Sequence, residues 1–130
     1  MFTDLGSKFN VHGHRFPKDA QGRVRFFDEN GNTLAEIDKL LENGKVMLAV
    51  EIKSKLKQDD VDNHIERLSI ISKHNEKHGD NRLVLGAVAG GIVADNVQKY
   101  AQGKGLYVLV RNGKSVDLAV MPSGFEPTAW

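Results

Sequence analysis

Glu51 and Lys53 stand two residues apart in the segment LAVEIKSK, and their side-chain types are suited to binding ions. Side chains alternate along a β-strand, so this carboxylate and this amine point the same way, whereas Val50 and Ile52 point the other way. A carboxylate can hold a divalent cation, and an ammonium group attracts anions. Alone, such a pair is most often a solvated strand face, so its meaning depends on the neighbouring strand.

The segment before Glu51 predicts a hairpin that adds acidic side chains to the same face. Asn43-Gly44 is typical of a two-residue hairpin turn. This turn places Glu36 directly across from Glu51 and Asp38 across from Ala49. The opposite face of the hairpin is apolar and is the predicted core.

Carboxylates directly opposed on neighbouring strands repel each other, so their pairing is unfavourable unless another group compensates the repulsion. A like-charge pair directly opposed on two strands costs from a few tenths to about 1 kcal/mol. A divalent cation reverses this cost, because Mg²⁺ binds carboxylate oxygens in octahedral geometry and keeps several waters. The pattern therefore predicts a Mg²⁺ or Mn²⁺ site that contains Asp38, Glu51 and Glu36. The alternative is a solvated face on which Glu36 and Asp38 serve solubility.

The remaining periodicity predicts the elements that position this hairpin. Strands are expected over 23–28, 33–41, 45–53 and 82–89, helices over 1–10, 58–78 and 92–102, and a last hairpin over 106–110 and 115–120. The order predicts one domain over residues 1–130 with a mixed α/β (α+β) sheet packed by helices. Asp59 or Asp60 is the expected N-cap of the long helix.

Composition narrows the classes of function. The chain has 130 residues, a formal net charge of +1 and no cysteine, which excludes disulfides and thiolate chemistry. No apolar run is long enough to span a membrane, and MFTDLGSKFN lacks the layout of a secretory signal, so a cytoplasmic protein is expected. The first helix opens without a capping residue, as expected for the C-terminal part of a longer protein. The last hairpin exposes a sheet edge that must be covered or paired, which favours a homodimer.

The residues around the hairpin match a known pattern. An Asp on one strand, a turn, Glu-x-Lys on the next strand and then a helix resembles the PD-(D/E)XK nuclease superfamily. The stretch LAEIDKLLENGKVMLAVEIKSKLKQDDVDNHIERL is similar to the C-terminal domain of a group of uncharacterised bacterial proteins assigned to that superfamily. The likeness runs over residues 2–130 and includes GAVAGGIV and GFEPTAW. It implies a restriction-endonuclease-like core, α-β-β-β-α-β, with an additional helix and a C-terminal hairpin.

The resemblance also implies roles for individual residues. Asp38 matches the aspartate of the motif, Glu51 its second acid and Lys53 its lysine. In that family the two carboxylates and the intervening carbonyl, here that of Ile52, hold Mg²⁺, and the lysine positions or activates the attacking water. Glu36 is an extra acid that would replace the ligand many members supply from the first helix. The implied activity is metal-dependent hydrolysis of phosphodiester bonds in DNA.

Basic side chains beside the predicted site are suited to phosphate contacts. Lys55, Lys57 and Arg67 would form a nucleic-acid-binding patch, or else simply solvate the loop and helix that follow the strand. His64, near the first turns of the long helix, would approach the hairpin site and support its residues or contact phosphate, or else lie on the surface. Arg25 is expected near Glu36 across the first hairpin. The alternative function is a catalytically inactive nuclease-like domain that binds nucleic acid or a protein partner.

Overall fold

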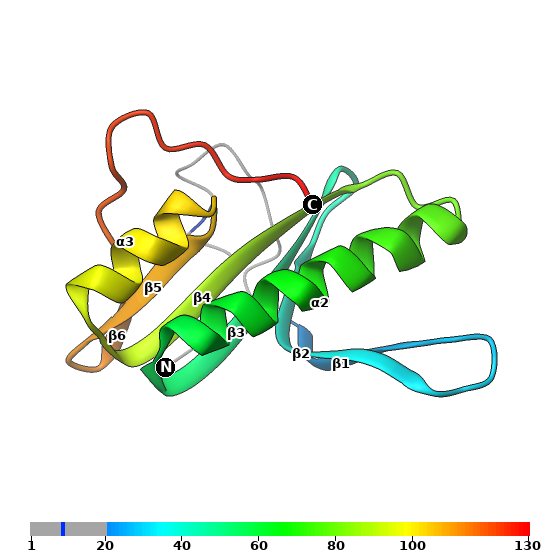
Figure 1. Ribbon diagram of the computed structural model, residues 1–130, viewed down its shortest axis with the longest axis horizontal. Coiled ribbons are helices and arrows are strands. Elements are labelled where there is room, and N and C mark those ends of the chain that lie inside the picture. Colours follow the sequence, from blue (N-terminus) through cyan, green and yellow to red (C-terminus); the bar gives the residue numbers. More distant parts are fainter. Residues whose placement is uncertain (1–8, 10–20) are drawn as a thin grey trace.

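The structure, a computed structural model, describes Phe9 and residues 21–130. In this part of the chain two helices and six strands follow one another (Figure 1). The elements are β1 (Gln21–Phe27), β2 (Thr33–Glu42), β3 (Val46–Leu56), α2 (Gln58–Lys77), β4 (Leu83–Val93), α3 (Asp95–Gly103), β5 (Tyr107–Asn112) and β6 (Ser115–Leu118). The helix predicted over 1–10 lies outside the described residues, except for Phe9, which is buried edge-on against Tyr107.

The six strands form one mixed sheet in sequence order, β1-β2-β3-β4-β5-β6. β1, β2 and β3 pair antiparallel, β3, β4 and β5 pair parallel, and β6 pairs antiparallel with β5. The parallel pairs need crossover connections, which α2 and α3 provide. The prediction of a mixed α/β sheet packed by helices is confirmed.

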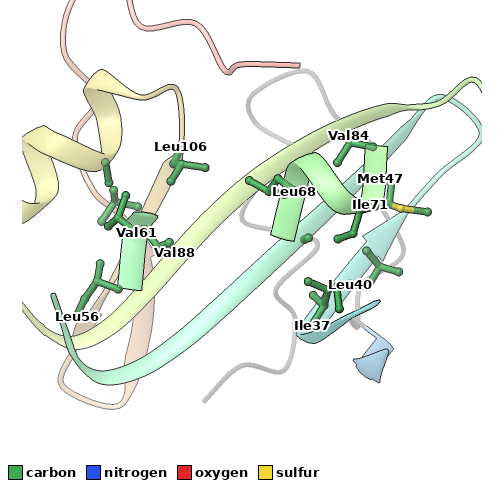
Figure 2. Close-up of a cluster of buried hydrophobic side chains, with 14 of the residues drawn as sticks. Ile37, Leu40, Met47, Leu56, Val61, Leu68, Ile71, Val84, Val88 and Leu106 are labelled. Carbon is green, nitrogen blue, oxygen red and sulfur yellow. The ribbon is translucent and has the colours of Figure 1, made fainter. Parts of the chain in front are cut away.

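Both faces of the central strands are buried, which explains why β3 and β4 are almost continuously apolar. α2 and α3 lie on one face of the sheet (Figure 1), over the cluster drawn in Figure 2. Leu68 and Ile71 of α2 point into this cluster against Val84 and Met47 (Figure 2). The opposite face buries a second cluster that contains Leu48, Val50, Leu85, Leu109 and Phe9. A side chain on Gly86 would collide with Leu68, so this glycine lets α2 approach β4 closely.

β4 is longer than predicted, and the helix after it begins later. The strand was expected over 82–89 and the helix over 92–102, but β4 runs to Val93 and α3 begins at Asp95. The reason is main-chain pairing with β3, which continues through Lys55↔Ile92 and Leu56↔Val93. Gly90 and Gly91 concealed a strand whose length is set by pairing with its neighbour.

α2 begins as predicted at Gln58, but its capping differs from the prediction. Lys57, rather than Asp59 or Asp60, is the N-cap residue. Asp60 contributes from the third helical position, where its carboxylate accepts the main-chain N–H of Lys57 at 2.9 Å. This is the reciprocal half of a capping box, and it fixes where β3 ends and α2 starts.

Removing the Asp60 carboxylate should destabilise the protein measurably. In Asp60→Ala the N–H of Lys57 loses its acceptor, and we expect the free energy of unfolding to fall by about 1 kcal/mol. Asp59→Ala is the matched control, because Asp59 is also an acid in the first turn and loses the same favourable interaction with the helix dipole. Urea denaturation of both variants measures the difference. Equal losses in the two would show that the hydrogen bond contributes nothing.

Candidate active site

The turn between β2 and β3 sets the register of the site and differs from the prediction. The Asn43 side chain accepts the N–H groups of Lys45 and Val46, both at 2.7 Å, so the two central turn residues are Gly44 and Lys45. Asparagine commonly closes turns through its own side chain in this way. Pairing is therefore shifted by two residues from the prediction, and Leu40, not Asp38, lies opposite Ala49.

A shift of two residues keeps the side chains of the paired segment on their predicted faces. Continuing the observed pairing of Lys39 with Val50 by one step brings Asp38 across from Glu51. The predicted partner of Glu51, Glu36, is displaced to the outer part of β2. The prediction that Glu36 opposes Glu51 was therefore wrong, and the acid beside Glu51 is Asp38.

β2 leaves β3 at Asp38. Its pairing with β3 ends at Lys39, whereas its pairing with β1 continues outward, so the two form an arm that extends away from the sheet (Figure 1). Ile37 and Leu40 both enter the cluster under α2, which regular alternation forbids for residues three apart. Arg23, the β1 residue level with Asp38, has a φ of 43°, in the left-handed region that side chains rarely adopt. A local irregularity thus lies at Asp38.

The Asp38 carboxylate takes over the hydrogen bonding that the diverging strand no longer provides. Its Oδ2 atom accepts the main-chain N–H of Ile52 at 2.9 Å. The same carboxylate lies within hydrogen-bonding reach of the Glu51 carboxylate. Asp38 is therefore fixed to β3 beside Glu51 by both a side chain and a backbone group.

The two carboxylates differ strongly in acidity. Burial, and then the neighbouring Asp38, raise the pKa of Glu51 to about 7. Burial also pushes the pKa of Asp38 upward, but the hydrogen bonds from Glu51 and from the Ile52 N–H outweigh it, and the pKa is lowered. Such a split is expected when two acids share one site, because the first negative charge opposes the second. Near neutral pH this pair gains from an added positive charge.

Lys53 follows on the same side of β3 and is half-buried. Its positive charge lowers the pKa of both Asp38 and Glu51, which places its ammonium group in the electrostatic field of the pair. The three residues of the predicted motif are thus brought together by the fold.

α2 contributes Arg67, whose side chain pairs with Glu51. A guanidinium nitrogen of Arg67, Nη1, donates a hydrogen bond to Oε2 of Glu51 in an ion pair. The side chain of Glu51 is 8% exposed and that of Arg67 is 28% exposed, so the arginine covers the inner side of the carboxylate while part of it reaches solvent. Arg67 was predicted as a phosphate contact, and its partner here is the acid itself.

The position of His64 differs from the prediction. Its side chain is fully buried, so it is neither a surface histidine nor placed to contact DNA, but it does approach the hairpin at Glu51, as one alternative predicted. Its Nε2 lies 3.0 Å from the carbonyl oxygen of Ala49, which can only accept, so Nε2 carries the hydrogen. Its Nδ1 lies 4.0 Å from Oε2 of Glu51 and, within the part of the chain that the structure describes, has no hydrogen-bond partner. Burial lowers the pKa of His64 to about 4, so the ring is neutral.

The burial of His64 could have been found from the sequence. Val61, His64, Leu68 and Ile71 repeat at helical spacing, and all are buried in α2. Ile65 competes with His64 for this stripe at similar spacing, but it is only half-buried. The contact between Arg67 and Glu51 had no such signal, since it joins residues of two elements.

Glu36 lies apart from the carboxylate pair. It faces Arg25 across the β1–β2 hairpin, as predicted, with a nitrogen-to-oxygen distance of 3.7 Å, and Arg23 approaches it at 3.6 Å. Over Phe9 and residues 21–130, no group of three His, Asp or Glu side chains is placed to hold a metal ion. The predicted role of Glu36 as a ligand opposite Glu51 was therefore based on the wrong register.

Lys55 and Lys57 are exposed where β3 ends and α2 begins. They keep the predicted position on the surface next to the motif residues. The basic patch thus consists of two exposed lysines and, deeper, the partly exposed Arg67 that is bound to Glu51.

The donor set fits a small, hard divalent cation. The Asp38 and Glu51 carboxylates offer only oxygen, which Mg²⁺ and Mn²⁺ prefer. Mg²⁺ in proteins is commonly bound through one or two carboxylates, with waters and substrate phosphates completing the octahedron. Burial is the first cause of the raised pKa of Glu51 and the neighbouring Asp38 the second, and a cation at the pair would favour the ionised form.

None of the described helices has the length and apolar character needed to cross a membrane.

Comparisons with known proteins do not assign this chain to a family. No protein-family model matches the chain, and no curated protein matches it either.

Proposed function

We propose that this protein is a metal-dependent nuclease that hydrolyses phosphodiester bonds in DNA. The observation that supports this most directly is the carboxylate pair: Asp38 and Glu51, from two different strands, lie within hydrogen-bonding reach of each other beside Lys53. The proposal includes membership of the PD-(D/E)XK nuclease superfamily, which rests on the resemblance of the motif and its hairpin.

In this proposal some residues bind the metal ion and others act on the water and the phosphate. Asp38, Glu51 and the carbonyl of Ile52 would hold Mg²⁺ or Mn²⁺. When bound, the ion supplies electrostatic stabilisation of the charge that grows on the phosphate and makes a water more acidic. The Lys53 ammonium would orient the attacking water by hydrogen bonding and stabilise the same charge. Burial and the Ile52 N–H keep Asp38 in one orientation, so little reorganisation is needed.

Exposed lysines would hold the DNA. Lys55 and Lys57 extend from the end of β3, next to the motif, so a backbone phosphate bound by them would lie near Lys53. Contacts of this kind position the duplex without reading its sequence. Weak sequence preference and strong dependence on salt concentration are the expected properties of binding.

A non-catalytic binding module is the second candidate, and one observation favours it. Arg67 already satisfies the Glu51 carboxylate within the protein, so the site has a stable arrangement without any metal. In this case the lysines and the fold would remain useful for binding DNA or a protein partner, while hydrolysis would be absent.

Plasmid nicking tests the proposal. Purified protein is incubated with supercoiled plasmid in Mg²⁺ or Mn²⁺, and conversion to open-circular and linear DNA is followed on a gel. We expect nicking that coelutes with the protein, stops in EDTA and persists in Glu76→Gln, an exposed acid on α2 far from the pair.

The two candidates give different outcomes. A salt-sensitive gel shift without cleavage in either metal would contradict the nuclease and support the binding module. Absence of both binding and cleavage would exclude DNA as the partner.

A further inference from the structure

We propose that Arg67 is a built-in counter-ion that occupies Glu51 in the metal-free protein and transfers to a DNA phosphate when the divalent cation binds. This inference rests on the proposed function and adds a second state to its site. It makes Arg67 a residue with two alternative partners, the acid and the substrate.

The geometry puts Arg67 and the cation in competition for one carboxylate. Nη1 of Arg67 donates to Oε2 of Glu51, which also faces the buried ring of His64. Glu51 itself is 6% exposed, so few directions of approach remain. The Arg67 side chain is 28% exposed, so it can leave Glu51 toward solvent without passing through the core.

Charge balance favours displacement over simultaneous binding. Of the described groups that face Glu51, Asp38 is acidic, Lys53 and Arg67 are basic, and His64 is neutral. Two negative and two positive charges already cancel when Glu51 is ionised. A divalent cation added beside an unmoved guanidinium would leave an uncompensated double positive charge, and the two cations would repel at close range.

DNA supplies the second partner. A guanidinium binds carboxylate and phosphate with the same planar donor geometry, so release from Glu51 onto a phosphodiester exchanges one good acceptor for another. Arg67 lies on α2 one turn after His64, and therefore on the side of the helix that faces Glu51. A phosphate that approaches the cation from solvent would meet the displaced arginine.

An alternative role for Arg67, in which it orients Glu51 toward the ion, predicts the opposite change in metal affinity. If Arg67 only oriented Glu51 toward the ion, as partners of metal ligands often do, its removal would weaken metal binding, by about 10- to 100-fold. If Arg67 competes with the ion, its removal strengthens metal binding. The direction of the change therefore decides between the two roles.

The experiment measures Mn²⁺ binding by titration calorimetry in the absence of DNA. We expect Arg67→Met to bind Mn²⁺ about tenfold more tightly than the wild type, which corresponds to a modest coupling between the two cations. Arg67→Lys, which keeps the charge, should stay close to wild type. Lys45→Met, which removes an exposed charge at the distant β2–β3 turn, is the control for net charge.

A DNA-binding measurement tests the second step of the proposal, in which Arg67 binds a phosphate. With a short duplex and Ca²⁺ in place of Mg²⁺, fluorescence anisotropy should show weaker binding by Arg67→Met and a salt slope smaller by about 1. Tighter metal binding together with weaker DNA binding is the signature of an arginine that moves between the two.

The outcomes separate this inference from the proposed function. Wild-type protein that neither binds Mn²⁺ nor nicks DNA overturns the proposed function. Wild-type protein that binds Mn²⁺, with Arg67→Met binding it equally or less tightly, overturns displacement alone. Should Arg67→Met fail to fold, the Nε–Hε resonance of Arg67 in wild-type protein answers the question: it should shift on addition of Mg²⁺, and a signal that does not move contradicts displacement.

Discussion

Lys53→Met should lower plasmid nicking by about 10²- to 10⁴-fold, the range expected when a group that assists proton transfer or orients a water is removed. The Lys53 charge lies in the field of Asp38 and Glu51, so it is close enough to act on whatever those acids bind. Methionine keeps the length and apolar stem of the side chain and removes only the ammonium group. Mn²⁺ binding should remain, because a positive neighbour has been lost and no ligand has. Rates of nicking and calorimetric Mn²⁺ affinity, measured on the same preparations, check both statements.

Asp38→Asn is the comparison for this prediction. Asparagine retains an oxygen that can accept the Ile52 N–H, so the strand contact survives while the ligand charge is lost. This variant should lose Mn²⁺ affinity and nicking together, whereas Lys53→Met loses nicking alone. Full nicking by Lys53→Met would contradict a catalytic role for the lysine, even if the metal site proved real.

Glu51→Gln should make the stability of the protein rise with pH between about 4 and 6.5, by roughly 2–3 kcal/mol. In wild type two opposite effects overlap in this range. The pKa of His64 is lowered to about 4, so the unfolded chain binds more protons than the folded one up to its ordinary pKa of 6.5, and stability rises with pH. The pKa of Glu51 is raised from 4.5 to about 7, so the folded chain binds more protons there, and stability falls with pH.

The wild-type profile should therefore be nearly flat from pH 4.5 to 6.5. Removing Glu51 leaves the rising contribution of His64. Removing the histidine in His64→Gln leaves the falling contribution of Glu51, so stability should decrease as pH rises from about 4.5 to 7. Urea unfolding of the three proteins across this range measures the slopes. Parallel plots of stability against pH for all three proteins would show that folding shifts neither the pKa of Glu51 nor that of His64 as described.

Elements whose pattern reflects their own burial could be predicted from the sequence. The central strands are apolar on both faces, and α2 carries its buried side chains at helical spacing, so the starts of β3 and β4 and both ends of α2 were expected within one residue of their observed positions. The face shared by the candidate site residues could be predicted from the alternation of side chains along each strand. Asp38, Glu51 and Lys53 share a face in any register that differs by two residues, which is why a wrong turn assignment did not move them.

Features that depend on contacts between elements could not be predicted in this way. The turn is set by the Asn43 side chain, and the sequence Asn43-Gly44 is compatible with either position of the loop. The divergence of β2 from β3 involves an unusual backbone at Arg23 on a third strand. The ion pair between Arg67 and Glu51 joins α2 to β3, and no local pattern encodes it.

The bond between Asp38 and the Ile52 N–H has a mechanical consequence. It fastens the base of the β1–β2 arm to the central sheet at the point where the main-chain ladder has ended. The outer part of the arm is held separately by α2, because Phe26 packs edge-on against His74 and Lys77 pairs with Glu29. Asp38 therefore links the orientation of the arm to the Glu51 carboxylate, so a change in the angle between arm and sheet would alter the distance between the two acids.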